Sequence, residues 1–528
     1  MKIFNQKQLQ QWDAYTIEHE RLSEISLIEE AGQLLASEIE YRYLLSDRPV
    51  RICCGFGNNG ADGLMVAHEL SAFVPDLEIL IMHYTDRQSK GFQEAQKISS
   101  SLDIPTFDIY ESADLDGHIV DGALFIDAML GLGISRPLEG LLADVVSQLN
   151  HVKDVTRISL DYPTGMHPDR LIDGMIFKAD ATFSIGSLKL TSFFSESEPY
   201  IGKFIRIPLS LSAEFYRNTS SQYETIEVQE VISLSSNASA FSHKNSFGHV
   251  LFIGGSYGMM GAARLASEGA MRAGAGLVTA HVPGSGIDII QISLPEVMVS
   301  ADDNSHRITS LPDQLNERFD AICIGCGLGV DVNPELLKQL LMNYNGTKVI
   351  DADALNILAK NQELMDLLDS SCVLTPHVGE FHRLFGDCEN SEIRLTRLLA
   401  AAKKHGCHII LKGKHTKIAH PDGSCHFNMS GDVPLATAGS GDVLAGYLAG
   451  LMAGSMSVEQ ACKRGVSLHG FSGTLLRDMF GKRGAIARDI LDTLAHIEVY
   501  YNDWLQDLLG ELDEEQSLLG LDVLDNLN

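Results

Sequence analysis

Short runs of apolar residues recur through the first two hundred positions, and each is followed by glycine, proline or polar residues and then by a helical spacing. The runs are VRICCGF, LEILIMHY, ALFIDAML and RISLDYP. Continuous apolar runs of this length are typical of parallel strands buried on both faces, and the segments between them predict crossover helices. Residues 6–43 have helical spacing with few breakers, which predicts one or two helices ahead of a sheet that begins near Val50.

The pattern changes in the middle of the chain. Residues 209–245 are rich in Ser, Asn and Thr and have little periodicity apart from a weak ETIEVQEVI, so we place a domain boundary there. A second series of strands alternating with helices runs from HVLFIGGS through GLVTAHV, FDAICIGCG, KVIDADAL and CVLTPHVGE to HIILKGKHT. The prediction is an α/β protein with two doubly wound domains, at 1–225 and 226–505, and an acidic tail at 506–528 that forms a solvated helix or frays.

Composition and net charge indicate which classes of partner to expect. The 528 residues suit two or more domains, and 45% hydrophobic against 21% charged residues excludes disorder throughout. Seventy acidic against 40 basic residues give a net charge of −30, which repels phosphate backbones and anionic lipids, so we expect neither a nucleic acid nor a membrane partner. An anionic ligand must then be bound locally, by backbone N–H groups, a few cationic side chains or a metal ion.

The remaining global signals favour a reducing compartment. The amino terminus becomes polar after four residues, unlike a signal peptide, and no apolar run is long enough to span a membrane. Nine cysteines in so long a chain do not suggest a disulfide framework, so we predict a cytoplasmic protein. Cys323 and Cys326 form a CxxC without a second ligand pair, and small-residue packing is a better interpretation than a metal or redox site.

Three strand ends in the first half carry polar side chains. The segment RICCGFGNNGADGLMVAHEL runs from a strand through a Gly/Asn loop into a helix, and FIDAMLGLGISRPLEG and ISLDYPTGMHPD follow two later strands. A lone aspartate at a strand end is more often a helix cap than a ligand. Because the carboxyl ends of parallel strands meet at one edge, where open α/β sheets bind ligands, the three together predict a site containing Asn58, Asn59, Asp62, Asp127, Arg136, Asp161 and Thr164.

These segments resemble the signatures of the NAD(P)H-hydrate epimerase domain, over about residues 1–225. The motifs are GNNGADG, the segment from Asp127 to Pro137, and DYPTG. The resemblance implies that two loops hold the hydrated nicotinamide dinucleotide and that a potassium ion lies among side-chain oxygens, the donors that an alkali cation prefers. The implied substrate contacts are Asn58, Asn59, Gly60, Ala61, Asp62, Gly131, Leu132, Gly133, Ile134, Ser135, Arg136, Pro137 and Asp161, and the implied potassium ligands are Asn59, Asp127 and Thr164.

The implied reaction interconverts the R and S hydrates at C6 of the nicotinamide ring. Asp161 is the candidate for acid/base assistance, and Lys189 in GSLKL matches a lysine near the family's site. The chain departs from the family pattern at Ala61, where a second glycine is usual, and at Thr164, where serine is usual. Threonine keeps the hydroxyl, and alanine requires only that the loop have no positive φ at this position.

The second half contains a candidate anion hole. In LATAGSGDVLAGYLAGL, the GSGD sequence of residues 439–442 precedes a long helix of small residues, so consecutive N–H groups can face an anion. Asp442 can take a proton from an attacking hydroxyl, although a simple helix-capping role is the alternative.

GSGD in this position resembles the ribokinase-like superfamily, and the other motifs narrow the resemblance to the ADP-dependent NAD(P)H-hydrate dehydratase domain, over about residues 226–505. Those motifs are HKNSFGHVLFIGGSYGMMGAARLASEGAMRAGAGLV, CIGCGLG, IDADALN, LTPHVGEF and ILKGKHT, in this order. Cys326 replaces a proline that is common in the family's loop. The resemblance implies that the hydrate is contacted by Ala262, Gly327, His377 and the base Asp442, and the adenine nucleotide by Lys412, Gly413, Lys414, His415, Thr416 and Gly441.

The two resemblances together imply a bifunctional enzyme that repairs hydrated NADH and NADPH. The dehydratase would transfer a phosphoryl group from ADP to the C6 hydroxyl of the S hydrate, with Mg²⁺ and the glycine hole stabilising the charge, and phosphate would then leave. ADP rather than ATP rests on the resemblance alone. We expect a homo-oligomer. The alternatives are a vitamin or sugar kinase with an accessory domain, and a first half that binds nucleotide or acts as a scaffold without catalysis.

Overall fold

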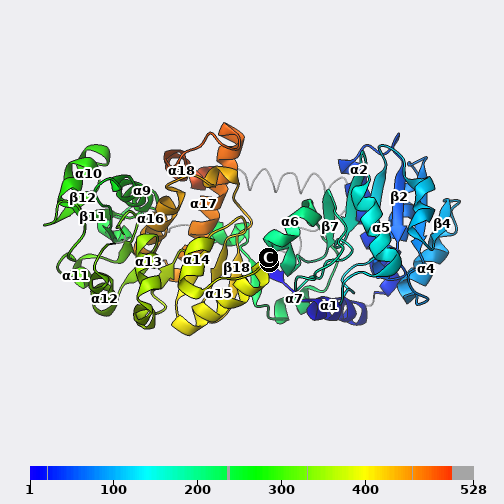
Figure 1. Ribbon diagram of the computed structural model, residues 1–528, viewed down its shortest axis with the longest axis horizontal. Coiled ribbons are helices and arrows are strands. Elements are labelled where there is room, and N and C mark those ends of the chain that lie inside the picture. Colours follow the sequence, from blue (N-terminus) through cyan, green and yellow to red (C-terminus); the bar gives the residue numbers. More distant parts are fainter. Residues whose placement is uncertain (21, 235–237, 330, 455, 502–528) are drawn as a thin grey trace. The chain divides into compact units, whose positions relative to one another are not determined.

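The computed structural model describes residues 1–20, 22–234, 238–329, 331–454 and 456–501 (Figure 1). The chain divides into two compact units, and the division falls between Tyr223 and Glu224. Residues 390–392 group with the amino-terminal unit, and the rest of the chain after Glu224 forms the carboxyl-terminal unit. The acidic tail predicted at 506–528 lies outside the described residues.

The amino-terminal unit contains a seven-stranded sheet in the order β4-β3-β2-β5-β6-β7-β8, in which every pair of neighbours is parallel. The chain leaves the middle of this sheet in both directions, as expected for a doubly wound fold with crossover helices. The prediction of a parallel α/β unit is therefore confirmed. Its strands are β2 (Val50–Cys54), β3 (Leu77–Met82), β4 (Thr106–Ile109), β5 (Leu124–Ala128), β6 (Thr156–Leu160), β7 (Ala181–Ile185) and β8 (Lys203–Ile207), with a short β1 (Lys2–Ile3) before them.

Two apolar cores cover the two faces of this sheet and make the unit a three-layer sandwich. One core contains side chains of α2 (Glu24–Arg42), α3 (Asn58–Leu70) and α4 (Lys90–Ser99), and the other is built on α5 (Gly140–His151). The helical spacing of residues 6–43 corresponds to α1 (Gln6–His19) and α2. The unit is completed by the short helices α6 (Glu198–Ile201) and α7 (Ala213–Asn218).

The carboxyl-terminal unit has a longer sheet in the order β9-β18-β17-β16-β15-β14-β13-β10-β11-β12. The strands from β12 to β16 run parallel, whereas β17 pairs antiparallel with both β16 and β18. The strands are β9 (Tyr223–Thr225), β10 (His249–Ile253), β11 (Leu277–Pro283), β12 (Met298–Asp302), β13 (Ala321–Ile324), β14 (Thr347–Ile350), β15 (Cys372–Leu374), β16 (His408–Leu411), β17 (Lys417–Ala419) and β18 (Cys425–Phe427).

The helix that follows GSGD, α16 (Ser440–Ala453), is buried almost all around and packs on α9 (Met260–Arg272). Small residues make this close approach possible, since a Cβ on Gly446 would lie 1.8 Å from the carbonyl oxygen of Ala266. The other helices are α8 (Val228–Ser233), α10 (Ile287–Ser293), α11 (Leu315–Arg318), α12 (Pro334–Asn343), α13 (Asp353–Lys360), α14 (Val378–Phe385), α15 (Ser391–His405), α17 (Val458–Phe480) and α18 (Ala487–Leu494).

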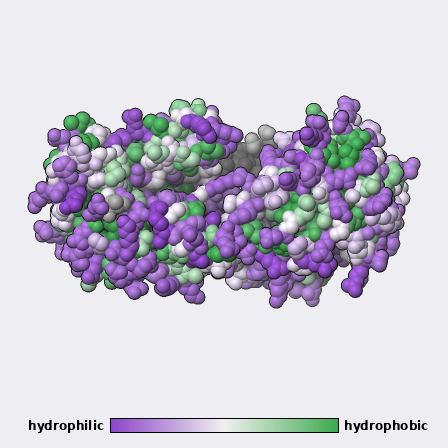
Figure 2. All heavy atoms as spheres, in the orientation of Figure 1, coloured by the Kyte–Doolittle hydropathy of each residue, from purple (hydrophilic) through white to green (hydrophobic). Residues whose placement is uncertain are grey.

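The strands that apolar runs failed to predict lie mainly at sheet edges. Three of the four residues of β4 are exposed, and β8 and β12 also present polar or exposed positions. An edge strand needs no continuous apolar run because one side of it faces water or a covering loop. Hydrophilic residues cover most of the face seen in Figure 2. Among the described residues, no helix has the length and apolar character needed to cross a membrane.

Candidate active sites

The amino-terminal unit contains a cavity of about 640 Å³ at the carboxyl ends of β2, β5 and β6. It is lined by predicted residues from all three strand ends, namely Asn58, Asn59, Asp62, Gly131, Leu132, Gly133 and Asp161. The other predicted contacts lie outside this lining: Gly60 and Ala61 are buried in α3, Ile134 is buried, and Ser135, Arg136 and Pro137 are exposed.

The loop before α3 is held by a close backbone contact. A Cβ on Gly60 would lie 1.8 Å from the carbonyl oxygen of Gly55, so only glycine fits there. Ala61 has no positive φ and is fully buried, so its methyl group is accommodated without strain. The departure from the family pattern at this position therefore leaves the loop intact.

Asp161 follows β6 in a left-handed conformation with φ of 59°, which is rare for a residue other than glycine. Its Oδ1 accepts a 2.5 Å hydrogen bond from Nζ of Lys189, whose side chain is completely buried. The same ammonium donates to Oγ of Ser184 at 2.9 Å and to the carbonyl oxygen of Ile185 at 3.0 Å. Lys189 thus uses its three donors and fixes one carboxylate oxygen of Asp161.

Two further aspartates line the same cavity. Burial and the nearby Asp161 raise the pKa of Asp13 to about 7, against a smaller opposing effect of Lys189. Burial also raises the pKa of Asp62 well above its usual range, and Asp161 and Asp13 add to the shift. The cavity therefore places an ammonium-paired carboxylate beside two carboxyl groups that hold their protons to higher pH.

Asp13 was not predicted from the sequence. It lies on α1 between Leu9 and Ile17, and these three residues, four apart, all face the cavity. A charged residue on the otherwise apolar stripe of a helix was the available signal.

The three residues expected to bind potassium lie around the same strand ends. Asp127 is fully buried, and its two carboxylate oxygens accept hydrogen bonds from the hydroxyl of Thr164 at 2.6 Å, the backbone N–H of Thr164 at 2.8 Å and the hydroxyl of Ser159 at 3.0 Å. Burial raises its pKa to about 6, although these hydrogen bonds oppose the shift. The amide of Asn59 is buried with neither its oxygen nor its nitrogen hydrogen-bonded.

The unpaired amide of Asn59 is the feature that a ligand would explain, since a buried polar group without a partner costs free energy. Asn59 is close to the cavity wall, because a Cβ on Gly131 would lie 3.2 Å from the Cβ of Asn59 and 3.4 Å from Oδ2 of Asp161. Carboxylate, hydroxyl and amide oxygens are hard donors, and this set fits an alkali cation.

In the carboxyl-terminal unit, Asp442 occupies the first turn of α16, and Gly439 with φ of 89° is the residue that caps the helix. Asp442 is therefore not the helix cap. Burial raises its pKa to about 6, and Asp351 contributes, whereas a hydrogen bond with Cys326 and the charge of Lys412 oppose the shift. A carboxylate with this pKa is ionised at neutral pH and is a stronger base than an ordinary aspartate.

Lys412 connects the start of α16 with the end of β14 and the first turn of α14. Its ammonium donates to Oδ1 of Asp351 at 2.9 Å and lies 3.9 Å from Oε2 of Glu380. These two carboxylates raise the pKa of Lys412 even though burial opposes the shift. A Cβ on Gly441 would lie 3.3 Å from the Lys412 nitrogen, so the glycine leaves room for a cation directly at the helix N-terminus.

The other predicted contacts surround this centre. Gly327, with φ of 63°, faces Ala262, since a Cβ on Gly327 would lie 3.1 Å from that of Ala262. His377 caps α14 through its Nδ1. A β-bridge between His377 and Lys412 aligns the segment before α14 with the end of β16. The turn that follows β16 contains the remaining predicted residues, Gly413, Lys414, His415 and Thr416.

Comparisons with known proteins find relatives of both units. A family described as YjeF-related protein N-terminus matches residues 24–191, and one described as NAD(P)H-hydrate dehydratase matches residues 250–496. The bifunctional NAD(P)H-hydrate repair enzyme of Coxiella burnetii is 30% identical over 512 residues, which cover 95% of this chain and 99% of that protein. The enzyme of the same name from Moorella thermoacetica is 32% identical over 521 residues, covering 94% and 96%.

A solved structure of an ADP/ATP-dependent NAD(P)H-hydrate dehydratase from Bacillus subtilis, co-crystallised with ATP and Mg²⁺, is 28% identical with a TM-score of 0.44 and covers 53% of this chain and 98% of its own. The full-length relatives span both units, so the predicted family is confirmed. The chain belongs to the family of bifunctional NAD(P)H-hydrate repair enzymes.

Proposed function

We propose that the amino-terminal unit epimerises R and S NAD(P)H hydrates and that the carboxyl-terminal unit dehydrates the S form with ADP, giving NAD(P)H, AMP and phosphate. The observation that carries the proposal is that each unit brings the charged groups of its own reaction together, Asp13 beside the Asp161–Lys189 pair in one and Asp442 near Lys412 in the other. Relatives named as bifunctional repair enzymes over their whole length favour this function over a sugar or vitamin kinase.

Epimerisation at C6 requires that a proton be given to the C6 hydroxyl and later be removed. After protonation the hydroxyl leaves as water while the lone pair of the ring nitrogen forms a double bond to C6, and water then adds to the other face with loss of a proton. Asp13, with a pKa of about 7, can donate the first proton and accept the last at neutral pH. Asp161, paired with Lys189, supplies the fixed negative charge that stabilises the cationic ring.

We assign the potassium ion to Asn59, Asp127 and Thr164. Its charge would offset the buried carboxylate of Asp127, and the carbonyl group of Asn59 would gain the partner that it lacks among the protein atoms. The ion would fix the first Gly/Asn loop against the ends of β5 and β6, which form the cavity wall.

In the carboxyl-terminal unit, Asp442 removes the proton of the C6 hydroxyl as its oxygen attacks the β-phosphoryl group of ADP. The N–H groups at the start of α16 and the ammonium of Lys412 face the transferred group and stabilise its charge. Phosphate then leaves C6 and a proton leaves C5, which restores the ring double bond. The carboxylate of Asp351 fits Mg²⁺, which binds one or two carboxylates together with nucleotide phosphates and would neutralise charge there, while Asp442 stays available as the base.

The proposal also covers the substrate-binding residues, the compartment and the oligomeric state. We assign the hydrate to Ala262, Gly327 and His377 and the nucleotide to residues 412–416 with Gly441. We place the enzyme in the cytoplasm because all nine cysteines are free and buried. We expect a homo-oligomer, to which gel filtration with light scattering is the direct test.

The absorbance of reduced nicotinamide near 340 nm tests both activities in one cuvette. Purified protein is mixed with R and S NADH hydrates, K⁺, Mg²⁺ and either ADP or ATP. Full recovery of absorbance with AMP formed in step supports both activities and ADP as donor. Recovery that stops when the S form is exhausted would remove the epimerase from the proposal, and no recovery with either nucleotide would favour the kinase alternative.

A further inference from the structure

Three histidines lie on one face of the antiparallel part of the carboxyl-terminal sheet. The register pairs Ile409 with Ala419 and Ile418 with His426, and side chains alternate between faces along each strand. His408, His420 and His426 therefore share a face, and all three are buried. The register of three short strands brings together residues that are up to 18 positions apart in the sequence.

The imidazoles form a continuous chain. Nδ1 of His408 lies 2.9 Å from Nδ1 of His420, and Nε2 of His420 lies 2.9 Å from Nδ1 of His426. Each ring therefore has at least one nitrogen within hydrogen-bond distance of a neighbouring imidazole. A neutral imidazole nitrogen is the form that binds a metal ion.

Helix α17 adds a carboxylate to this face. Glu459 in its first turn, His420 and His426 each offer one ligand atom, and these three atoms lie within 4.8 Å of one another. Lys463, one turn further along, donates to Glu459 at 2.8 Å and to Glu230 at 2.9 Å. The side chain of Glu459 is half exposed, so this carboxylate is accessible from solvent.

We propose that His420, His426 and Glu459 form a binding site for a first-row divalent cation such as Zn²⁺. Two imidazoles and one carboxylate are a ligand set found at zinc and iron sites, with remaining positions filled by water. Imidazole ligands disfavour Mg²⁺ and Ca²⁺, which prefer oxygen.

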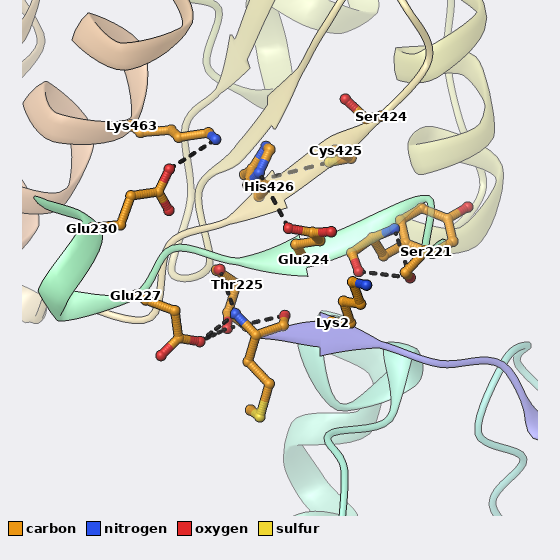
Figure 3. A network of polar contacts seen from close by, with 12 residues as sticks. Lys2, Ser221, Glu224, Thr225, Glu227, Glu230, Ser424, Cys425, His426 and Lys463 are labelled. Carbon is orange, nitrogen blue, oxygen red and sulfur yellow. Dashed lines mark hydrogen bonds and ion pairs between the residues drawn. The ribbon is translucent and has the colours of Figure 1, made fainter. Parts of the chain in front are cut away.

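The neighbouring groups suit this role. When Nε2 of His420 and Nδ1 of His426 bind the ion, His420 carries its proton on Nδ1 and donates it to His408, and His426 carries its proton on Nε2. That nitrogen lies 3.8 Å from Oε2 of Glu224 on β9. Figure 3 draws this contact as a dashed line. A carboxylate behind a ligating histidine fixes the tautomer and strengthens the ligand.

The charged groups around the histidines also favour a bound cation. The carboxylates of Glu224, Glu230 and Glu459 and the ammonium of Lys463 lie beside the histidines, and the pairing of Lys463 with Glu230 is visible in Figure 3. Asp422 and the amino-terminal ammonium also act on these rings, so carboxylates outnumber ammonium groups here, and a divalent ion would offset this excess of negative charge.

The site is separate from the dehydratase centre. His408 begins β16 and Lys412 follows its last residue, and four residues of extended strand span about 13 Å. The ion would connect the β17–β18 hairpin to α17, so its expected role is to stabilise the unit rather than to act on the hydrate.

Zinc binding to the full-length protein tests the proposal. Metal-free protein is titrated with Zn²⁺ by calorimetry, and the bound metal is counted by mass spectrometry after dialysis. We expect one Zn²⁺ per chain, a raised Tm, and loss of both effects in the His420→Gln, His426→Gln double variant. Glu459→Gln, at a half-exposed position that leaves the fold intact, should weaken binding by about tenfold or more.

Two matched controls separate ligation from general effects. Glu335→Gln changes an exposed first-turn glutamate of α12 that pairs with Lys338, and His249→Gln changes a histidine on β10 that pairs with a threonine hydroxyl. Both should bind Zn²⁺ like the parent protein.

Cobalt distinguishes the ligands by spectroscopy. Co²⁺ bound by nitrogen and oxygen should show visible d–d bands without a thiolate charge-transfer band. A thiolate band would overturn the assignment in favour of a cysteine such as Cys425, whose pKa burial raises to about 12. Zinc binding that Glu459→Gln and the double variant leave unchanged, or no binding at all, would also overturn it.

Discussion

Lys189→Met removes the ammonium that pairs with Asp161 and is the strongest test of how the epimerase cavity is built. The lysine side chain is completely buried and that of Asp161 is 13% exposed. Breaking a buried ion pair from one side costs about 3–5 kcal/mol, because the remaining charge is left in a poor solvent. Asp161 still accepts a hydrogen bond from the backbone of Ile185 at 3.3 Å and faces the cavity, so we expect the lower end of this range, about 3 kcal/mol.

Urea denaturation measures this loss in the amino-terminal unit. The chain has two tryptophans, and Trp12 is buried in this unit, so a Trp504→Phe background makes fluorescence report on Trp12 alone. Asp161→Asn and the double variant complete a mutant cycle. Because the double variant leaves no buried charge at the pair, it should be more stable than Lys189→Met by about 1–2 kcal/mol.

The expected functional result is selective. Lys189→Met should lose most of the epimerase activity while the carboxyl-terminal unit still dehydrates S hydrate, which the absorbance near 340 nm reports. Lys178→Met, an exposed lysine of the same unit, is the control and should change stability by less than about 0.5 kcal/mol. The reasoning is refuted if Lys189→Met costs less than about 1 kcal/mol, shows no coupling to Asp161→Asn and retains epimerase activity.

Four further predictions use the same assays. Asp13→Asn should remove an ionisation near pH 7 from the pH–rate profile of epimerisation, and an unchanged profile would exclude Asp13 as the titrating group. The rate of dehydration should rise with pH through about 6 as Asp442 ionises. Asp442→Asn should abolish dehydration while epimerisation continues. Loss of both activities in a folded protein would contradict two separate sites. Without K⁺, Asn59→Leu should raise the free energy of unfolding by about 1 kcal/mol, because it removes a buried unpaired amide. The variant should also lose any stabilisation by K⁺. Denaturation in K⁺ and in a bulky organic cation measures both effects. Gly441→Ala should raise the KM for ADP by about tenfold, equivalent to about 1.4 kcal/mol, because its Cβ would lie 3.3 Å from the Lys412 nitrogen; an unchanged KM would place the nucleotide elsewhere.

The central strands could be predicted from the sequence because strands buried on both faces consist of continuous apolar runs. The runs at Val50, Leu124 and His249 each begin a strand in the structure. The edge strands β4 and β12 carry exposed residues and lack this signal. The antiparallel strands β17 and β18 have three residues each, too few for a period to be recognised.

The site residues divide in a similar way. Asp161, Asp442 and Lys412 stand next to glycine or proline turns in dense motifs, so their neighbourhoods could be predicted from spacing. Asp13 lies far from any motif, and its raised pKa depends on charges that only the folded chain brings near. The histidine cluster depends on the register of β16, β17 and β18, which no local pattern specifies.

The two proposed catalytic aspartates show how partners, rather than residue type, decide a role. Asp161 and Asp442 both lie at the ends of buried elements, and sequence alone gives them the same description. Asp161 has a buried ammonium on one oxygen, which stabilises its charge and suits it to stabilise a cation. Asp442 has the like charge of Asp351 nearby and shares Lys412 with it, which favours proton uptake and suits it to act as a base. Exchanging those surroundings, by removing Lys189 or by neutralising Asp351, should therefore change what each aspartate does without changing the aspartate itself.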